Sequence, residues 1–262
     1  MQPGAVTVLF RVVIPARYGS VRLPGKVLHA IGGKPLLQWV YERACEAGAQ
    51  EVLIATDDDL IVSAAHSFGA TTVMTERAHA SGTDRIAEVA RIRGWGPQEI
   101  VINLQGDEPL MPPALIRQVA TLLDAQPQAD IATLAAPLEG VAQLLDPNVV
   151  KVVSDVQGRA LYFSRAPIPW NRDGAAEALA SQRDCGGARR HVGLYAYRVR
   201  ALLRLAQLPP GALEQREKLE QLRALENQMT IWVGDSEERP GPEVNTFADL
   251  QRVTALLTQR KT

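Results

Sequence analysis

Short runs of β-branched and other apolar residues alternate with helix-length amphipathic segments along the first half of the chain, and this alternation limits the possible folds. The strand-like runs are apolar throughout, which is typical of strands that are buried on both faces of a parallel sheet. Predicted strands cover residues 6–16, 51–56, 71–75 and 99–104, and predicted helices cover residues 35–48, 57–69, 83–93 and 114–123. The pattern predicts an α/β fold with a mainly parallel sheet.

The alternation breaks after a further predicted strand at residues 131–136. Three closely spaced strands are predicted there, at residues 149–154, 160–164 and 191–198, with a long loop over residues 171–190. Helix, strand and terminal helix follow at residues 213–227, 229–234 and 246–258. We therefore expect one domain over residues 1–262, with a β-rich subdomain inserted at about residues 137–198.

Charge and cysteine content exclude several classes of protein. Lys and Arg total 28 against 29 for Asp and Glu, so no overall positive charge favours nucleic acid or an acidic membrane surface. The two cysteines, Cys45 and Cys185, belong to no CxxC or Cys/His grouping, which argues against a zinc site or a disulfide framework. Since neither a signal peptide nor an apolar stretch of about 18 residues is found, we expect a cytoplasmic protein without a membrane segment.

A cationic loop follows the first predicted strand. Arg17, Arg22 and Lys26 lie within ten residues, and Gly19 and Gly25 allow the backbone to approach a ligand closely. The loop is neither a Walker A sequence nor a GxGxxG dinucleotide fingerprint. A solvated loop with scattered basic residues is the alternative, but three cations after a buried strand favour a phosphate-binding site.

Asp107 follows the strand predicted at residues 99–104, at the edge of the sheet where ligands of parallel α/β proteins bind. Its carboxylate could coordinate a hard cation such as Mg²⁺. The alternative is a turn aspartate that solvates the start of the next helix. The cationic loop upstream favours the metal site.

Four further groups of residues are candidates for a structural or a functional role. Ser81 or Thr83 could cap the helix predicted at residues 83–93, and free amide groups at that helix start could also bind a nucleotide. Arg165, Arg190 and His191 lie at strand ends, where they could bind a carboxylate or hydroxyl groups. Core packing best explains the apolar stripe Leu219, Leu222 and Leu225, and Glu220 and Gln221 beside it would by default face solvent.

Eight motifs follow one another along the chain, at residues 13–26 (VIPARYGSVRLPGK), 55–58 (ATDD), 79–85 (HASGTDR), 101–109 (VINLQGDEP), 148–153 (NVVKVV), 162–170 (YFSRAPIPW), 190–198 (RHVGLYAYR) and 219–223 (LEQLR). Together they resemble the 3-deoxy-D-manno-octulosonate (Kdo) cytidylyltransferases, also called CMP-Kdo synthetases. The resemblance implies a Rossmann-like nucleotidyltransferase fold with a small β-rich dimerisation subdomain, and hence a homodimer. It also implies transfer of CMP from CTP to Kdo, with release of pyrophosphate, for lipopolysaccharide biosynthesis, in a reaction that requires Mg²⁺.

The resemblance also implies roles for individual residues. Lys26, Asp107 and Arg22 would be catalytic, and the nucleotide would be bound by Arg17, Arg22, Lys26, Ser81, Gly82, Thr83 and Gln105. The sugar acid would be bound by Gln105, Arg165, His191, Tyr195, Glu220 and Gln221, which reverses the default interpretation of the last two. The metal would be held by Asp107 and by position 245.

Position 245 departs from the family pattern. The family has an aspartate in a GVDTxxDL run, whereas residues 243–250 read EVNTFADL, with Asn245 at the ligand position. The amide oxygen can coordinate Mg²⁺ but carries no charge, so weaker metal binding and slower turnover are expected unless Glu243 or Asp249 compensates. Two alternatives stay open: a cytidylyltransferase for a related sugar acid such as 8-amino-Kdo, or a catalytically impaired nucleotide-binding protein.

Overall fold

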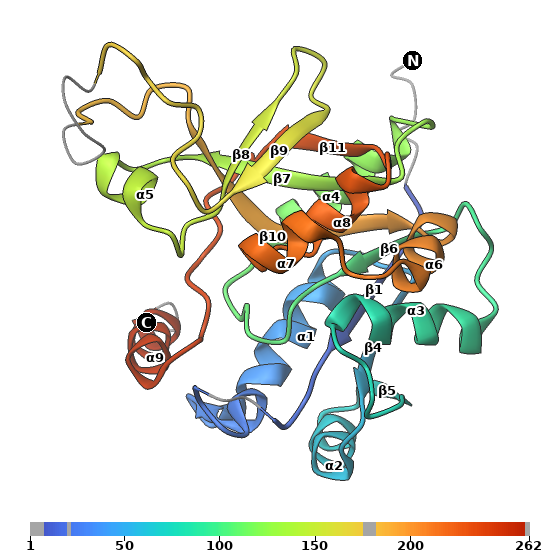
Figure 1. Cartoon of the computed structure of the whole chain (residues 1–262). Helices are drawn as coiled ribbons and strands as arrows, with labels where there is room; N and C mark the ends of the chain where they lie inside the picture. The colour runs from blue at the N-terminus through green and yellow to red at the C-terminus, as the bar shows by residue number, and fades with distance from the viewer. Residues whose placement is uncertain (1–7, 20–21, 175–181, 260–262) are drawn as a thin grey trace, which may run out of the picture.

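The computed structural model describes residues 8–19, 22–174 and 182–259 (Figure 1). Its strands are β1 (Phe10–Pro15), β2 (Ala30–Ile31), β3 (Lys34–Pro35), β4 (Glu51–Thr56), β5 (Thr71–Met74), β6 (Ile100–Asn103), β7 (Ile131–Pro137), β8 (Lys151–Ser154), β9 (Ala160–Ser164), β10 (Arg189–Arg198) and β11 (Ile231–Asp235). Its helices are the 3₁₀ helix η1 (Lys26–Leu28) and α1 (Leu36–Glu46), α2 (Asp59–Ser67), α3 (Gly82–Arg93), α4 (Pro113–Asp124), α5 (Val141–Leu145), α6 (Val199–Gln207), α7 (Ala212–Glu217), α8 (Gln221–Glu226) and α9 (Phe247–Gln259).

The central sheet is mainly parallel, as predicted. Its order is β11-β7-β10-β6-β1-β4-β5, and β1 pairs in parallel with both β4 and β6. The exception is β10, which runs antiparallel between β6 and β7. The predicted first strand begins at residues that lie outside the described part of the chain, and β1 itself starts at Phe10. The Rossmann-like α/β class is therefore confirmed.

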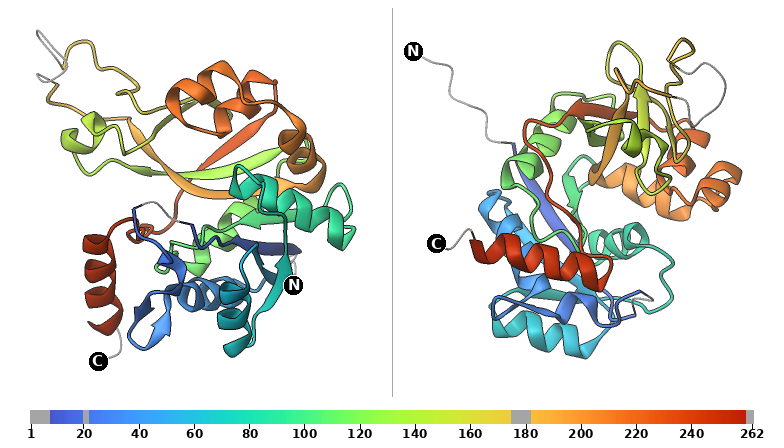
Figure 2. Two further views of the ribbon diagram at one scale, coloured as in Figure 1. Left: turned by 60° about the horizontal axis from the view of Figure 1, so that its bottom comes forward. Right: turned by 90° about the vertical axis from the view of Figure 1, so that its left-hand side faces the viewer.

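Helices cover both faces of the sheet, as the continuous apolar strands require (Figure 2). Val12 and Ile14 of β1 point into the core on the side of α1 and α4. Val13 of the same strand points into the second core, with α3 and α6. Because successive side chains of a strand point to opposite faces, a strand with a core on each side must be apolar at every position. The loops that follow the strands are then free to carry polar chemistry.

The predicted helix at residues 213–227 is wrong, because the chain forms two short helices there. Lys218 adopts a left-handed conformation with φ of 55°, and its N–H donates to the Glu214 carbonyl at 2.7 Å, which ends α7. The apolar stripe nevertheless packs as expected, with Leu219 and Leu222 buried. The break places the residues before and at the start of α8 beside the end of the sheet.

The hairpin β8–β9 stands above the sheet in Figure 1 and joins it through β10. The same β10 pairs with β6 and β7 further along its length, so it belongs to the central sheet as well. The inserted subdomain at about residues 137–198 stays a prediction, as does its part in a dimer. Among the described helices, none has the length and apolar character needed to cross a bilayer.

Lys151 of β8 is fully buried and ties three chain segments together. Its ammonium group donates to the carbonyls of Asp146, Val149 and Arg165 at 2.9, 2.6 and 2.6 Å. Burial lowers the pKa of Lys151, against the opposing effect of the nearby carboxylates. With three donors and three acceptors, the ammonium group has its hydrogen-bonding capacity satisfied.

We expect Lys151→Met to lower the free energy of unfolding by about 3 kcal/mol, because an apolar side chain of similar length leaves buried carbonyls without donors. Urea denaturation measures this change. Lys34→Met is the matched control, since Lys34 forms a partly exposed ion pair with Glu42. A loss for Lys151→Met no larger than that of the control would contradict the structural role of the buried ammonium group.

Candidate active site

Two adjoining cavities open where the central strands end. The first, of about 200 Å³, is lined by the loop after β1, the start of α3 and the loop after β6. The second, of about 100 Å³, lies between α3, β10 and the start of α8. They share Gly82 and Gln105, so ligands bound in the two cavities would contact the same two residues.

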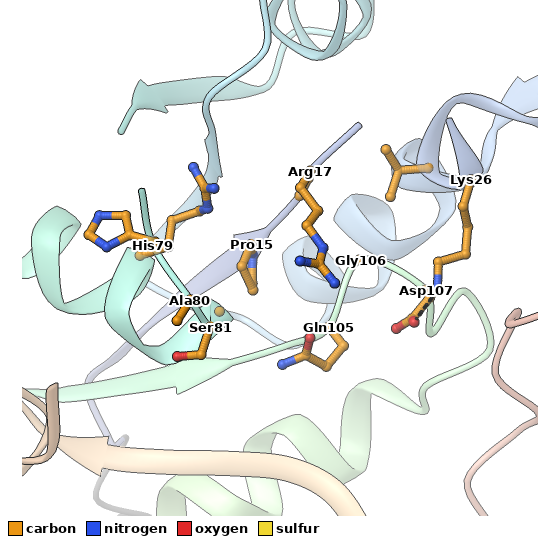
Figure 3. Close-up of a pocket in the computed structure, with 13 residues that line it drawn as sticks. Pro15, Arg17, Lys26, His79, Ala80, Ser81, Gln105, Gly106 and Asp107 are labelled. Atoms are coloured by element: carbon orange, nitrogen blue, oxygen red, sulfur yellow. Dashed lines mark hydrogen bonds and ion pairs between the residues drawn. The ribbon is translucent and has the colours of Figure 1, made fainter. Parts of the chain in front are cut away.

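The first cavity brings together most of the residues expected to bind a nucleotide. Those that line it are Arg17, Lys26, Ser81, Gly82 and Gln105, and Asp107, expected to be catalytic and to bind the metal, lines it as well. In Figure 3, Lys26 and Asp107 lie at one side of the cavity, and His79 and Ser81 lie at the other. Thr83 lines the second cavity instead, and Arg22 contacts Asn245 beside the first.

Lys26 and Asp107 face the same cavity, as expected from the sequence. The Lys26 ammonium group donates to Oδ2 of Asp107 at 2.6 Å and to Oδ1 of Asn245 at 3.4 Å. Arg22 Nη2 donates to the same amide oxygen at 2.9 Å. Gly25, with a φ of 63°, supplies the left-handed turn that starts η1 and directs Lys26 toward this cluster.

Two glycines allow the loops to approach the end of β1. A Cβ atom on Gly106 would lie 3.1 Å from the Pro15 carbonyl oxygen, and one on Gly82 would lie 3.1 Å from Cγ of Pro15. The role of Gly106 is therefore close packing against β1 next to Asp107. A side chain at either position would require Pro15 or the loop to shift.

The start of α3 is held by a capping box. Ser81 Oγ accepts from the Asp84 N–H at 3.1 Å, and the Asp84 carboxylate accepts from the Ser81 N–H at 3.2 Å. Thr83 does not cap the helix, because its hydroxyl group donates to the carboxylate of Glu220. Ser81 and Thr83 therefore face different cavities.

The second cavity contains four of the residues expected to bind the sugar acid, namely Gln105, Tyr195, Glu220 and Gln221. Burial raises the pKa of Tyr195 well above its usual value, so the phenol remains a hydrogen-bond donor. Burial also raises the pKa of Glu220, whose Oε1 lies 3.7 Å from Nη2 of Arg223. The polar lining suits a ligand with many hydroxyl groups.

Arg165 and His191 are not among the described residues that line either cavity. Arg165 Nε donates to the Glu217 carbonyl at 2.6 Å, and Nη1 donates to the Pro147 carbonyl at 2.9 Å. The imidazole of His191 packs against Tyr195 with ring centroids 5.1 Å apart. Their contact with a sugar acid stays a prediction.

His191 is neutral at physiological pH. Burial lowers its pKa to about 3, and Nε2 lies 3.0 Å from the hydroxyl oxygen of Thr133. A neutral imidazole can exchange hydrogen bonds with a ligand but supplies no positive charge to a carboxylate. This limits its role to hydrogen bonding and packing.

The low pKa of His191 predicts a loss of stability in acid. In the unfolded chain the imidazole takes up a proton below about pH 6.5, whereas the folded protein does not until about pH 3. The stability that this neutral imidazole contributes is therefore complete above pH 6.5 and is lost as the pH falls toward 3. Relative to His191→Gln, the wild type should lose about 2 kcal/mol of unfolding free energy between pH 7 and pH 5. Equal losses for the two proteins in urea titrations at these pH values would refute this assignment.

Several residues that line the two cavities have no role predicted from the sequence. His79 and Arg85 line the first cavity, and Asn103 and Tyr197 line the second. The Asn103 amide oxygen accepts from Gln105 Nε2 at 2.8 Å, which orients the Gln105 amide. All four residues lie within the ordered motifs. Tyr195 and Tyr197 are two positions apart on one strand, and this spacing indicates that they share a face of the sheet.

The residues around Asp107 offer oxygen ligands for a divalent cation. Among the described residues, no group of three or more acidic, histidine or cysteine side chains gathers to hold a metal. Mg²⁺, however, commonly takes only one or two protein oxygens and completes its shell with water and substrate phosphates. Asp107 Oδ2 and Asn245 Oδ1 already share one cation, the Lys26 ammonium group, so these residues fit a Mg²⁺ site.

Comparison with known proteins agrees with this geometry. Residues 11–231 match the family described as cytidylyltransferase. A 3-deoxy-manno-octulosonate cytidylyltransferase of Thioalkalivibrio sulfidiphilus is 53% identical over 95% of this chain and 98% of its own length. That of Pseudomonas syringae pv. syringae is 52% identical over 96% of this chain and 99% of its own.

A solved structure of CMP:2-keto-3-deoxy-manno-octonic acid synthetase complexed with CTP superposes with a TM-score of 0.86 at 42% identity, covering 96% of this chain and 99% of that one. The fold, the cationic loop and the paired cavities define a nucleotidyltransferase of the cytidylyltransferase class. Within that class, the chain belongs to the 3-deoxy-manno-octulosonate cytidylyltransferase family.

Proposed function

We propose that this protein transfers the cytidylyl group of CTP to Kdo, giving CMP-Kdo and pyrophosphate for lipopolysaccharide biosynthesis. The acceptor hydroxyl oxygen forms a bond to the α-phosphorus, the bond from that phosphorus to the pyrophosphate oxygen breaks, and the hydroxyl proton is released. The observation that carries the proposal is the Lys26–Asp107 pair in a cavity that adjoins a second, polar cavity at Gly82 and Gln105.

The first cavity would bind the nucleotide. Arg17, Arg22 and Lys26 offer positive charge to the triphosphate, and Ser81 and Gly82 lie at the far side, where the cytosine would sit. Phosphoryl-type transfer is catalysed mainly by positioning and by neutralising the charge on the leaving group. The basic residues on the loop after β1 would supply both the positioning and the positive charge, and no nucleophilic side chain is needed.

Magnesium dependence is part of the proposal. Asp107 and Asn245 would hold the ion, which when bound would neutralise phosphate charge and make the acceptor hydroxyl group more acidic. Before nucleotide binds, Lys26 neutralises the Asp107 carboxylate. The phosphates would draw the Lys26 ammonium group toward themselves and so leave oxygens of Asp107 and Asn245 to the metal.

The second cavity would bind the sugar acid. Tyr195 and Gln221 offer hydrogen bonds to hydroxyl groups, and Gln105 lies between the two substrates. Arg165 and His191, which are not among the described residues that line this cavity, would add contacts to the sugar acid when it is bound. Kdo is favoured over 8-amino-Kdo by the names of the relatives, and the same assay compares the two acceptors.

We also propose a cytoplasmic homodimer. Both cysteines are free thiols, which suits a reducing compartment. The β8–β9 hairpin exposes Val156 and Leu161, two apolar side chains that a second copy of the chain could cover. Analytical ultracentrifugation measures the assembly state.

The direct test is pyrophosphate release from CTP in the presence of Kdo and Mg²⁺. We expect release only when all three are present, and slower release with ATP, GTP or UTP. Folded protein that binds CTP but releases no pyrophosphate with Kdo or 8-amino-Kdo would support the impaired nucleotide-binding alternative and contradict the proposal.

A further inference from the structure

Asn245 reaches the site through a fixed stretch of backbone. Val244 is fully buried, and its N–H donates to the Asp107 carbonyl at 2.9 Å. On the other side, the N–H groups of Asn245 and Thr246 donate to Oδ2 of Asp249 at 3.1 and 2.9 Å. The backbone of Asn245 is therefore held from both directions, and the remaining freedom is the orientation of its amide group.

An asparagine side chain can bind a cation through one end only. Oδ1 is an acceptor, whereas Nδ2 is a donor that repels a cation, and the two ends exchange by a half turn of the amide. An aspartate has no such restriction, because its two oxygens are equivalent. A site with asparagine therefore needs something that keeps the oxygen turned toward the cation.

Glu243 contacts the nitrogen end of the amide and favours the same orientation as the two cations at the oxygen end. Its Oε2 accepts a hydrogen bond from Asn245 Nδ2 at 2.8 Å. The opposite end of the amide then faces the Lys26 ammonium and the Arg22 guanidinium groups, which both donate to Oδ1. A carboxylate can only accept from the amide, so the reversed amide would lose the bond to Glu243 and turn its N–H groups toward two cations.

Asp249 does not orient the Asn245 amide, because its own oxygens are engaged elsewhere. Its Oδ2 already accepts from the N–H groups of Asn245 and Thr246 and from the Thr246 hydroxyl group at 2.8 Å. These contacts hold the start of α9, and Oδ1 lies 3.7 Å from Nη2 of Arg252. Of the two acidic residues near Asn245 in sequence, Glu243 is the one that contacts its side chain.

We propose that Glu243 is a positioning residue that fixes the Asn245 amide with its oxygen toward the cation site beside Asp107. It thereby allows asparagine to act as a metal ligand at a position where the amide could otherwise turn its nitrogen toward the cation. The inference rests on the proposed function for the identity of the cation. Glu243 itself is exposed, and it contacts the nitrogen end of the Asn245 amide, whereas Lys26 and Arg22 contact the oxygen end.

The test is Mn²⁺ binding, followed by the electron paramagnetic resonance signal of free Mn²⁺ with CTP present and no sugar acid. Glu243→Gln should raise the Kd of Mn²⁺ about tenfold, because a glutamine amide can either accept from or donate to the Asn245 amide and so no longer selects one orientation of this metal ligand. The same substitution in an Asn245→Asp background should change the Kd by less than about twofold, because a carboxylate needs no orientation. Glu237→Gln, an exposed change on the same connecting segment, is the control and should leave the Kd unchanged.

Equal weakening by Glu243→Gln in both backgrounds would show that only its charge matters and would overturn the inference, as would no change in either. Because no turnover takes place, the measurement is independent of the acceptor. Wild-type protein that binds Mn²⁺ with CTP but releases no pyrophosphate with Kdo would contradict the proposed function and leave the comparison of the variants interpretable.

Discussion

Asp107→Asn is expected to lower kcat at least about 100-fold, the usual effect of removing one group that stabilises transition-state charge. Among the described residues that line the first cavity, Asp107 is the one carboxylate, so the substitution removes its negative charge. The cation site would then hold two neutral amides, the one introduced by the substitution and that of Asn245. Initial rates of pyrophosphate release at saturating CTP and Kdo measure the effect.

The fold should survive Asp107→Asn. The pair is partly buried, with the side chains of Lys26 and Asp107 14% and 22% exposed, but asparagine has the shape of aspartate and its amide oxygen can still accept a hydrogen bond from Lys26. Asp235→Asn, which weakens an exposed ion pair with Arg189, is the matched control and should keep full activity. A variant at position 107 that keeps more than a tenth of the wild-type rate would remove Asp107 from the proposed chemistry.

Lys26→Met should lower kcat/KM for CTP about 100-fold as well, but for a different reason. The methionine cannot neutralise phosphate charge, whereas Asp107 and Asn245 keep their oxygens and lose the cation that occupies them. We therefore expect a higher KM for CTP together with a lower kcat. Mn²⁺ binding without nucleotide should be no weaker than in the wild type.

The control for Lys26→Met is Lys34→Met, the same chemical change at a surface ion pair. It should leave both kinetic constants unchanged. A Lys26→Met variant with a wild-type KM for CTP would show that the Lys26 ammonium group does not contact the phosphates, and the nucleotide would then have to be placed elsewhere in the cavity.

Most of the central sheet could be predicted from local patterns. The strand at residues 51–56 has the predicted bounds, and α4 differs from its prediction by one residue at each end. These elements carry their signal in consecutive residues, because burial on both faces requires apolar side chains at every position of a strand. The short helices α5 and α6 were missed. In the segment that became α7 and α8, the helical spacing gave no sign of the left-handed residue Lys218.

The residue types of the candidate site could be predicted from the sequence, but their arrangement in space could be predicted only in part. Three cations after β1 and a carboxylate after β6 follow from the rule that ligands bind at the carboxyl ends of parallel strands. The position of β10 between β6 and β7 follows from no local pattern, because its pairing partners lie far away along the chain. That strand nevertheless carries Tyr195 into the second cavity, while it leaves His191 behind it.

The sequence alone determined the alternating elements, the cationic loop, the aspartate at the end of β6 and the family, since each of these is written in neighbouring residues or ordered motifs. Only the tertiary structure decided which end of the Asn245 amide faces Lys26, 219 positions away, and that Glu243 rather than Asp249 holds it there. The physical reason is that a hydrogen bond depends on distance and direction in space, and these are set by the packing of the whole chain.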